Sequence, residues 1–130
     1  MRATGPAVSR IEIPGLRPWR EGKVRSVYEA GSDHLVIVAS DRLSAYDSIL
    51  PTPIPGKGEV LTRLSVFWFG RLKSAVPHHF VSADPRGYPP PFGDHAAELE
   101  GRSMLVRRAE RVDIECVVRG HLTGSGWREY

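Results

Sequence analysis

The sequence contains two pairs of strand-like stretches, one within residues 23–39 and the other within residues 103–119. Residues 23–29 alternate between apolar and polar positions, residues 34–39 form a short apolar run, and Gly31-Ser32-Asp33 links them. A three-residue link rich in turn formers between two strand patterns predicts a β-hairpin. Residues 103–108 and 112–119 are two further strand patterns with a short connection, and they predict a second hairpin.

One segment between these pairs has the spacing of a helix. In residues 59–73, apolar side chains recur at Leu61, Leu64, Trp68 and Leu72. Positions separated by three or four residues share one face of a helix. We therefore predict one principal helix here and expect its apolar stripe to pack on the sheet.

The remaining segments are expected to be irregular. Residues 1–18 read as a loose lead-in and residues 19–130 as one domain. Residues 77–101, with five prolines, read as a long excursion with one short helix near 95–99. Together the pattern predicts an α+β fold, mainly antiparallel sheet with one principal helix.

Charge and composition narrow the class of protein. The formal net charge is +3, and the basic residues are scattered instead of concentrated as in nucleic-acid-binding proteins. No apolar run approaches the roughly 18 residues of a membrane span. The chain has one cysteine, Cys116, and its histidines show no metal-ligand spacing. We expect a cytoplasmic protein with no nucleic-acid partner, no membrane contact and no metal ligands of its own.

The start of the first strand pattern carries a candidate phosphate site. Alternation would place Lys23 and Arg25 on one face, about 7 Å apart. Gly22 precedes them and would let the backbone approach a ligand closely. A polyphosphate needs cations and backbone N–H groups at several oxygens. Ordinary surface cations at a strand edge would give the same pattern.

A second candidate is the polar stretch 40–47, which follows directly on a buried strand. Asp41, Ser44 and Asp47 supply two carboxylates and a hydroxyl for a polar ligand. A helix cap and a turn would explain the same residues. Lys57, between two glycines, could reach a phosphate, but we expect it to lie in an exposed turn before the helix.

The third candidate lies near the end of the chain. Alternation would place Glu115 and Arg119 on one face of a strand and Cys116 on the opposite, core-facing side. Because burying unpaired charge costs several kcal/mol, the charged face should open on water or on a polar ligand. Ser125, in a turn flanked by glycines, would add donors for an anion; a simple surface ion pair beside a glycine-rich turn remains the alternative.

Taken in order, these segments resemble the SAICAR synthetase (phosphoribosylaminoimidazole-succinocarboxamide synthase) family. The resemblance covers about residues 19–130, the N-terminal part of that family. It is carried by four stretches: Gly22-Lys23-Val24-Arg25-Ser26-Val27-Tyr28, residues 39–47, Lys57-Gly58 with Leu61-Thr62 and Ser65, and Ile114-Glu115-Cys116-Val117-Val118-Arg119-Gly120 with Thr123-Gly124-Ser125-Gly126.

The resemblance implies a ligase of purine biosynthesis. The family joins L-aspartate to carboxyaminoimidazole ribonucleotide and splits ATP, with Mg²⁺, through an acyl phosphate. Its N-terminal lobe is similar to the small lobe of protein kinases. By resemblance, the ATP phosphates would lie along Gly22, Lys23 and Arg25, and the adenine near 103–108 and the residues after it. The substrates would contact Glu115, Arg119, Ser125, Asp41, Ser44 and Asp47. The resemblance assigns no catalytic residue within these segments.

Length separates this chain from the family. Family members run about twice as far, and their second half carries an Asp-x-Lys-x-Glu motif and the metal-binding carboxylates. We therefore expect a fragment with little or no synthase activity by itself. The alternatives are a non-catalytic nucleotide-binding fragment and one half of a split enzyme that works with a complementary C-terminal chain.

Overall fold

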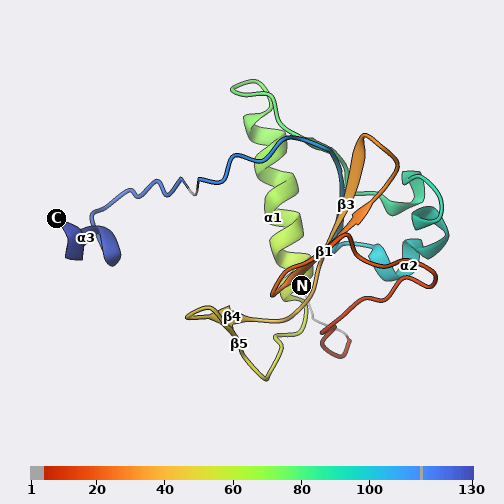
Figure 1. Ribbon diagram of the computed structural model, residues 1–130, viewed down its shortest axis with the longest axis horizontal. Helices are drawn as coiled ribbons and strands as arrows, with labels where there is room; N and C mark the ends of the chain where they lie inside the picture. The colour runs from red at the N-terminus through yellow and green to blue at the C-terminus, as the bar shows by residue number, and fades with distance from the viewer. Residues whose placement is uncertain (1–4, 115) are drawn as a thin grey trace.

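The centre of the protein is a five-stranded antiparallel sheet (Figure 1). The computed structural model describes residues 5–114 and 116–130. The strands lie in the order β1-β2-β3-β7-β6. Their bounds are Arg20–Glu21 (β1), Arg25–Glu29 (β2), His34–Ala39 (β3), Ser103–Arg107 (β7) and Phe80–Ser82 (β6).

The first predicted hairpin is confirmed. Strands β2 and β3 pair with Val27 opposite Ile37, and the N–H of Ala30 donates to the carbonyl of His34 across the turn at 3.0 Å. The side chains of Tyr28 and Val36 point to one face of the sheet, where both are buried. The sequence predicted this pairing because both signals for it are local: the strand pattern of each stretch and the short link of turn formers between them.

The second predicted hairpin is wrong. Strand β7 pairs with β3 and β6, and residues 112–114 and 116–119 form no strand. They belong to an extended arm that leaves the sheet and ends in the short helix α3, Ser125–Glu129 (Figure 1). A strand needs a neighbour for its N–H and C=O groups, and both edges of β7 are already paired. The apolar side chains of Ile114 and Val118 are therefore exposed, at 73% and 96%.

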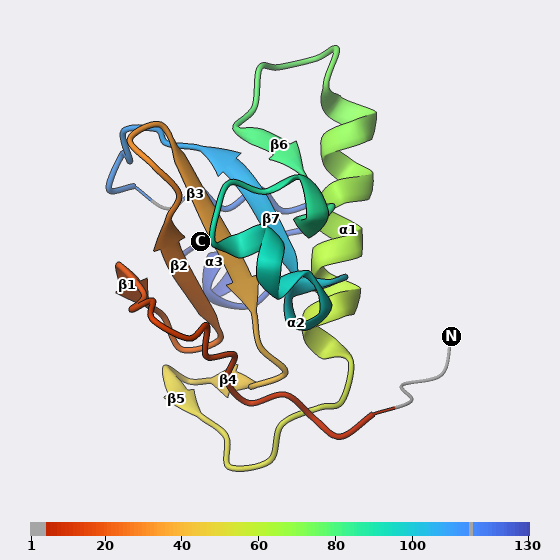
Figure 2. The same cartoon turned by 90° about the vertical axis from the view of Figure 1, so that its right-hand side faces the viewer.

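The core lies on one face of the sheet. That face packs against the segment between β6 and β7, which contains η1 (Pro85–Gly87), η2 (Phe92–His95) and α2 (Ala96–Leu99) (Figure 2). The short helix predicted near residues 95–99 is thus confirmed. Phe92 and Leu99 are fully buried, and the Phe92 ring meets Tyr28 edge-on at 6.1 Å between centroids.

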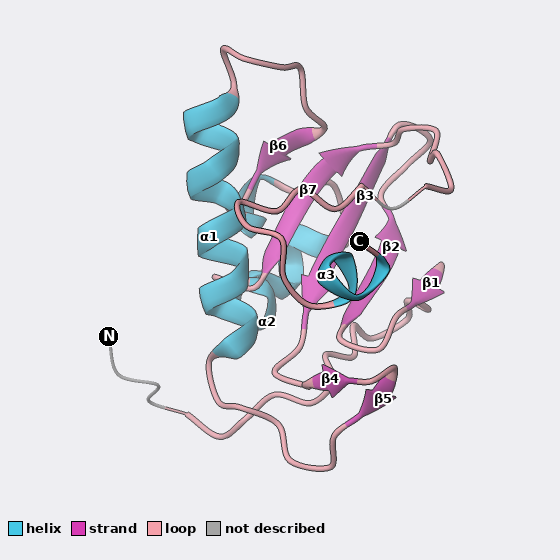
Figure 3. Ribbon diagram, turned by 90° about the vertical axis from the view of Figure 1, so that its left-hand side faces the viewer, coloured by secondary structure: helices cyan, strands magenta, loops and turns pink. Residues whose placement is uncertain are grey.

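The principal helix α1, Lys57–Leu72, lies on the opposite face (Figure 3). Its buried residues are Gly58 and Thr62, and the Phe69 ring stacks on Phe80 of β6 at 5.3 Å. The helix is confirmed, but the expectation that its apolar stripe packs on the sheet is wrong. Leu64 and Trp68 are 49% and 54% exposed because the neighbouring helix face makes the contact.

Two short strands form a separate hairpin beside the sheet. Strands β4 (Ser44–Ala45) and β5 (Ser48–Ile49) pair antiparallel and are joined through Tyr46 and Asp47. The φ angles of these two residues are 48° and 67°. Positive φ at both central positions gives a turn whose twist matches the strands. The hairpin therefore holds Asp47 at an exposed tip.

The lead-in before β1 contains neither helix nor strand over residues 5–18. It nevertheless contributes Ile13 to the core, where this side chain is 3% exposed. No helix among the described residues is both long enough and apolar enough to cross a membrane.

Candidate functional site

The connection between β1 and β2 is a tight loop that carries two cations. The N–H of Gly22 donates to the carbonyl of Arg25 at 2.7 Å, which closes the loop around Lys23 and Val24. Lys23 therefore lies in the turn and not, as predicted, within the strand, because β2 begins at Arg25. The loop still presents both cationic side chains from one short backbone segment.

Lys23 meets a carboxylate from the β4–β5 hairpin. The Nζ atom of Lys23 forms an ion pair with Oδ1 of Asp47. The Asp47 side chain is 90% exposed and that of Lys23 is 43% exposed, so an exposed pair of this kind adds little stability. The ion pair thus links Lys23, predicted to bind phosphate, with Asp47, predicted to contact substrate. It also shows that an anionic group fits beside the Lys23 ammonium.

Asp41 points away from this pair, into the protein. The side chain is fully buried, and its carboxylate accepts from the N–H groups of Val8 and Gly58, both at 2.8 Å, and of Gly56 at 3.3 Å. Nη1 of Arg102 donates to the same carboxylate at 3.3 Å. The carboxylate that the sequence predicted to contact substrate is thus buried and bound by donors of the protein itself.

The environment of Asp41 keeps its carboxylate ionised. Burial alone would raise the pKa of Asp41, but the N–H groups of Val8, Gly58 and Gly56 and the Arg102 guanidinium together lower the pKa below its ordinary value. The first N–H groups of α1 have no partner within the helix, and they are matched here by a buried anion. The N-terminus of α1 is therefore already satisfied by the protein itself.

Three residues of this region were not assigned a role from the sequence. Ser40 and Arg42 contact the β1–β2 loop, and Arg102 links Asp41 to Glu59, with 3.1 Å between Nη2 and Oε1. Ser40 and Arg42 belong to the polar stretch 40–47, so the sequence had already marked their segment as a candidate site. Arg102 carried no local signal because its partners lie 43 and 61 residues away in the sequence.

An apolar hollow lies between β2 and α1. It has a volume of about 450 Å³, and its wall is formed by exposed and half-buried side chains of α1 with Arg25 at the edge. The other lining residues are Leu61, Leu64, Ser65, Trp68, Phe69 and Leu72. Arg25 therefore lies both next to the β1–β2 loop and at the edge of this hollow, on the sheet face that also carries α1.

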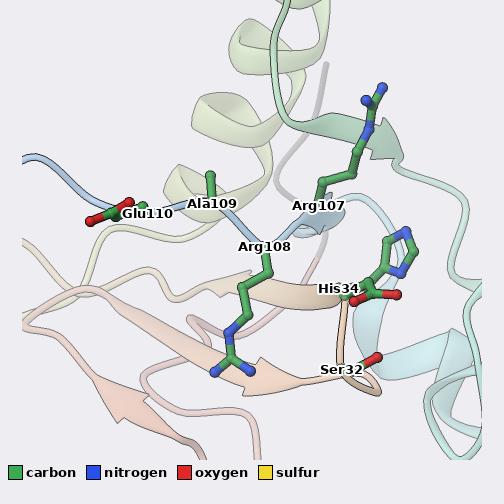
Figure 4. A pocket seen from close by; sticks show the side chains of 7 residues that line it. Ser32, His34, Arg107, Arg108, Ala109 and Glu110 are labelled. Atoms are coloured by element: carbon green, nitrogen blue, oxygen red, sulfur yellow. The ribbon is translucent and has the colours of Figure 1, made fainter.

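A second hollow, of about 540 Å³, lies at the far end of β2, where the β2–β3 turn meets the residues after β7 (Figure 4). Arg107 and Arg108 point away from each other in this view. Arg108 is held by Glu29 at 2.6 Å and lies over the ring of Trp19. The two guanidinium groups do not converge on one anion, which argues against a phosphate site here.

The predicted ribonucleotide residues lie on the C-terminal arm. Glu115 is outside the described residues. Nη2 of Arg119 donates to Oγ of Ser125 at 3.2 Å, so these two are together, but the arm holds them apart from the β1–β2 loop (Figure 1). Cys116 is exposed and not core-facing as predicted, because the strand that would have turned it inward does not form.

Acidic, histidine and cysteine side chains do not gather into a metal site in the part of the chain that the structure describes. Over residues 5–114 and 116–130, no three of them lie close enough to hold an ion. The described residues therefore do not form a Mg²⁺ site by themselves.

Comparison with known proteins places this geometry in a family. The family model for SAICAR synthetase matches residues 18–130. Phosphoribosylaminoimidazole-succinocarboxamide synthase of Desulfosudis oleivorans is 53% identical over 95% of this chain and 42% of its own length. The protein of the same name from Methylococcus capsulatus is 52% identical over 91% of this chain and 39% of its own length.

A solved structure supports the same relationship. The chain is similar to SAICAR-synthase from Saccharomyces cerevisiae complexed with SAICAR, with a TM-score of 0.82 and 40% identity over 95% of this chain and 44% of that chain. The chain spans about two fifths of the length of these relatives.

Proposed function

We propose that this chain, which belongs to the SAICAR synthetase family, supplies the ATP-binding part of an enzyme that joins L-aspartate to carboxyaminoimidazole ribonucleotide. The ATP phosphates lie along Gly22, Lys23 and Arg25. The single observation that carries this proposal is the β1–β2 loop, where a closed turn presents two cations, and where the Asp47 carboxylate that pairs with Lys23 is 90% exposed and free to give way to a phosphate, unlike the buried Asp41.

The two other places that could attract a polyphosphate are less suitable. The N-terminus of α1 is occupied by the Asp41 carboxylate, which would repel a phosphate. In the hollow beside Arg107 and Arg108, the two guanidinium groups diverge. The β1–β2 loop combines a glycine, exposed cations and an adjoining open sheet face, and these features suit an extended anionic ligand.

A nucleotide can then lie along β2. From Arg25 to Glu29 the strand rises about 13 Å, at roughly 3.3 Å per residue. The phosphates lie at the Arg25 end and the adenine at the other end, beside residues 107–110, which comprise the last residue of β7 and the three that follow it. Val27 and Ile37 are half-buried on the open face between these ends and form an apolar floor.

The chemistry requires stabilisation of charge on the transferred phosphoryl group. A carboxylate oxygen of the ribonucleotide attacks the γ-phosphorus, the bond to ADP breaks, and an acyl phosphate forms. The aspartate amine then attacks the acyl carbon, loses a proton and displaces phosphate. Lys23 and Arg25 offset the negative charge that develops on the phosphate oxygens in the first step, which is the main contribution a protein makes to phosphoryl transfer.

Substrate contacts beyond ATP follow the family pattern. Arg119 and Ser125 hold the ribonucleotide with Glu115, and Ser44 and Asp47 line the substrate side. The Asp41 carboxylate is satisfied by protein donors, so we assign it a supporting role. The C-terminal half of the family, whether it continues this chain or belongs to a complementary C-terminal chain, would supply the metal ligands and bring the arm to the loop. The exposed side chains of Val117 and Trp127 on the arm suit such a contact.

Replacing Lys23 with glutamine should weaken ATP binding about tenfold, equivalent to about 1.4 kcal/mol, because one cation at the phosphates is lost. Isothermal titration calorimetry with the 130-residue chain measures the effect. Lys73→Gln, at the end of α1, is the matched control and should leave the affinity unchanged. Equal affinities of the Lys23 and Lys73 variants would refute the assignment of the phosphate site.

A further inference from the structure

The backbone on both sides of Lys23 is held from the segment that follows β3. Nη2 of Arg42 donates to the carbonyl of Gly22 at 3.2 Å. The N–H and the hydroxyl of Ser40 both donate to the carbonyl of Val24, each at 3.0 Å. Lys23 lies between Gly22 and Val24, so the backbone is held by hydrogen bonds on both sides of this residue.

The two supports are also joined to each other. Nε of Arg42 donates to Oγ of Ser40 at 3.1 Å, and Nη2 of Arg42 lies 4.0 Å from a carboxylate oxygen of Glu21. Ser40 is 6% exposed, and the side chain of Arg42 is 18% exposed. A shielded, planar guanidinium that reaches two oxygens at once is more rigid than a lysine at the same place.

This arrangement determines which backbone groups the loop shows to a ligand. In a trans peptide the C=O and the following N–H point in opposite directions. Because the Gly22 carbonyl turns toward Arg42, the N–H of Lys23 turns away from it. A loop whose carbonyls are held inward presents N–H groups outward, as anion binding requires.

We infer that Ser40 and Arg42 are positioning residues that hold the β1–β2 loop in the shape that receives a polyphosphate. The inference rests on the proposed function, since it assigns a purpose to the loop's shape. Neither residue touches the ligand. They act through the carbonyls of Gly22 and Val24 and reduce the ordering that binding would otherwise require.

The test uses inorganic tripolyphosphate as the probe and the 130-residue chain as the protein. Arg42→Gln should weaken tripolyphosphate binding about tenfold, the effect of losing roughly 1.4 kcal/mol. Arg42→Lys should weaken it to a similar extent, because one ammonium group does not reproduce the fork between Ser40 and Gly22. Recovery of the original affinity by Arg42→Lys would show that Arg42 acts by charge on the ligand, and would overturn the inference.

A second readout needs no ligand. Hydrogen exchange at the Gly22 amide, which closes the loop onto Arg25, should accelerate about tenfold in Arg42→Gln and in Ser40→Ala. Arg86→Gln, at an exposed arginine paired with Glu100, is the matched control and should leave it unchanged. If Arg42→Gln does not fold, Ser40→Ala carries both measurements.

The outcomes separate the two claims. Unchanged Gly22 exchange in the folded variants would overturn the role of Ser40 and Arg42, whatever the chain binds. If the unaltered chain does not bind tripolyphosphate, the proposed function fails, and the purpose assigned to Ser40 and Arg42 fails with it. Binding that is weakened by Lys23→Gln but not by Arg42→Gln would overturn the inference alone.

Discussion

Replacing Asp41 with asparagine should lower the free energy of unfolding by about 3 to 5 kcal/mol, the usual cost of breaking a buried ion pair from one side. The substitution removes the charge opposite Arg102, whose side chain is 8% exposed. It also puts an amide NH₂ where one carboxylate oxygen accepted either from Val8 and Gly56 or from Gly58 and Arg102. The NH₂ group of the asparagine would then face buried N–H donors with no acceptor between them.

Denaturant unfolding at neutral pH measures this loss. Asp84→Asn is the control, because Asp84 is an exposed carboxylate that also pairs with an arginine, Arg86. The control should change the free energy of unfolding by less than about 1 kcal/mol. A loss below that value for Asp41→Asn would contradict the structural role assigned to this carboxylate.

The contribution of Asp41 should also depend on pH in a defined direction. Its folded pKa lies below the ordinary value, so its stabilisation is present above the unfolded pKa of about 3.9 and is lost as pH falls through the folded pKa. The difference in stability between the original chain and Asp41→Asn should therefore be largest near neutral pH and shrink below about pH 4.

Replacing Gly58 with alanine should destabilise the protein by about 1 to 3 kcal/mol, the usual cost of overpacking. A Cβ atom at Gly58 would lie 2.7 Å from the carbonyl oxygen of Ala39 and 3.1 Å from that of Ser40. Both are backbone atoms at the end of β3, so they do not move aside cheaply. Helix α1 would shift away from Asp41, to which the Gly58 N–H donates.

Gly70→Ala is the matched control on the same helix. Nothing lies within 4 Å of a Cβ atom there, so alanine should stabilise the helix by up to about 1 kcal/mol. Thermal and denaturant unfolding of both variants gives the comparison. Similar stabilities for Gly58→Ala and Gly70→Ala would mean that α1 does not approach β3 as closely as the structure shows.

The sequence was informative where the determinants of structure are local. The hairpin of β2 and β3 followed from alternation and a turn-forming link, and the extent of α1 was predicted to within two residues from apolar spacing. Residues 112–119 had an equally regular pattern but form no strand in their described part. Periodicity states which face a strand would bury, but it does not supply the partner that a strand requires.

The site shows the same division. Lys23 and Arg25 were predicted as a pair because they are close in sequence to each other and to a glycine, and the structure places both at the β1–β2 loop. Asp41 and Asp47 lie six residues apart in one polar stretch, yet one is buried and the other is exposed. Asp41 turns inward toward the N–H groups of Val8 and Gly58 and toward Arg102, 61 residues away, and a single sequence does not reveal these contacts.

If the β1–β2 loop receives the phosphates of ATP, its backbone amides must sense the ligand. The most direct test is a backbone amide chemical-shift map of the 130-residue chain titrated with ATP and, separately, with tripolyphosphate. We predict that both ligands shift the amides of Gly22, Lys23 and Arg25, and that ATP also shifts amides in residues 107–110. Shifts confined to residues 107–110, or no saturable shifts at all, would contradict the account.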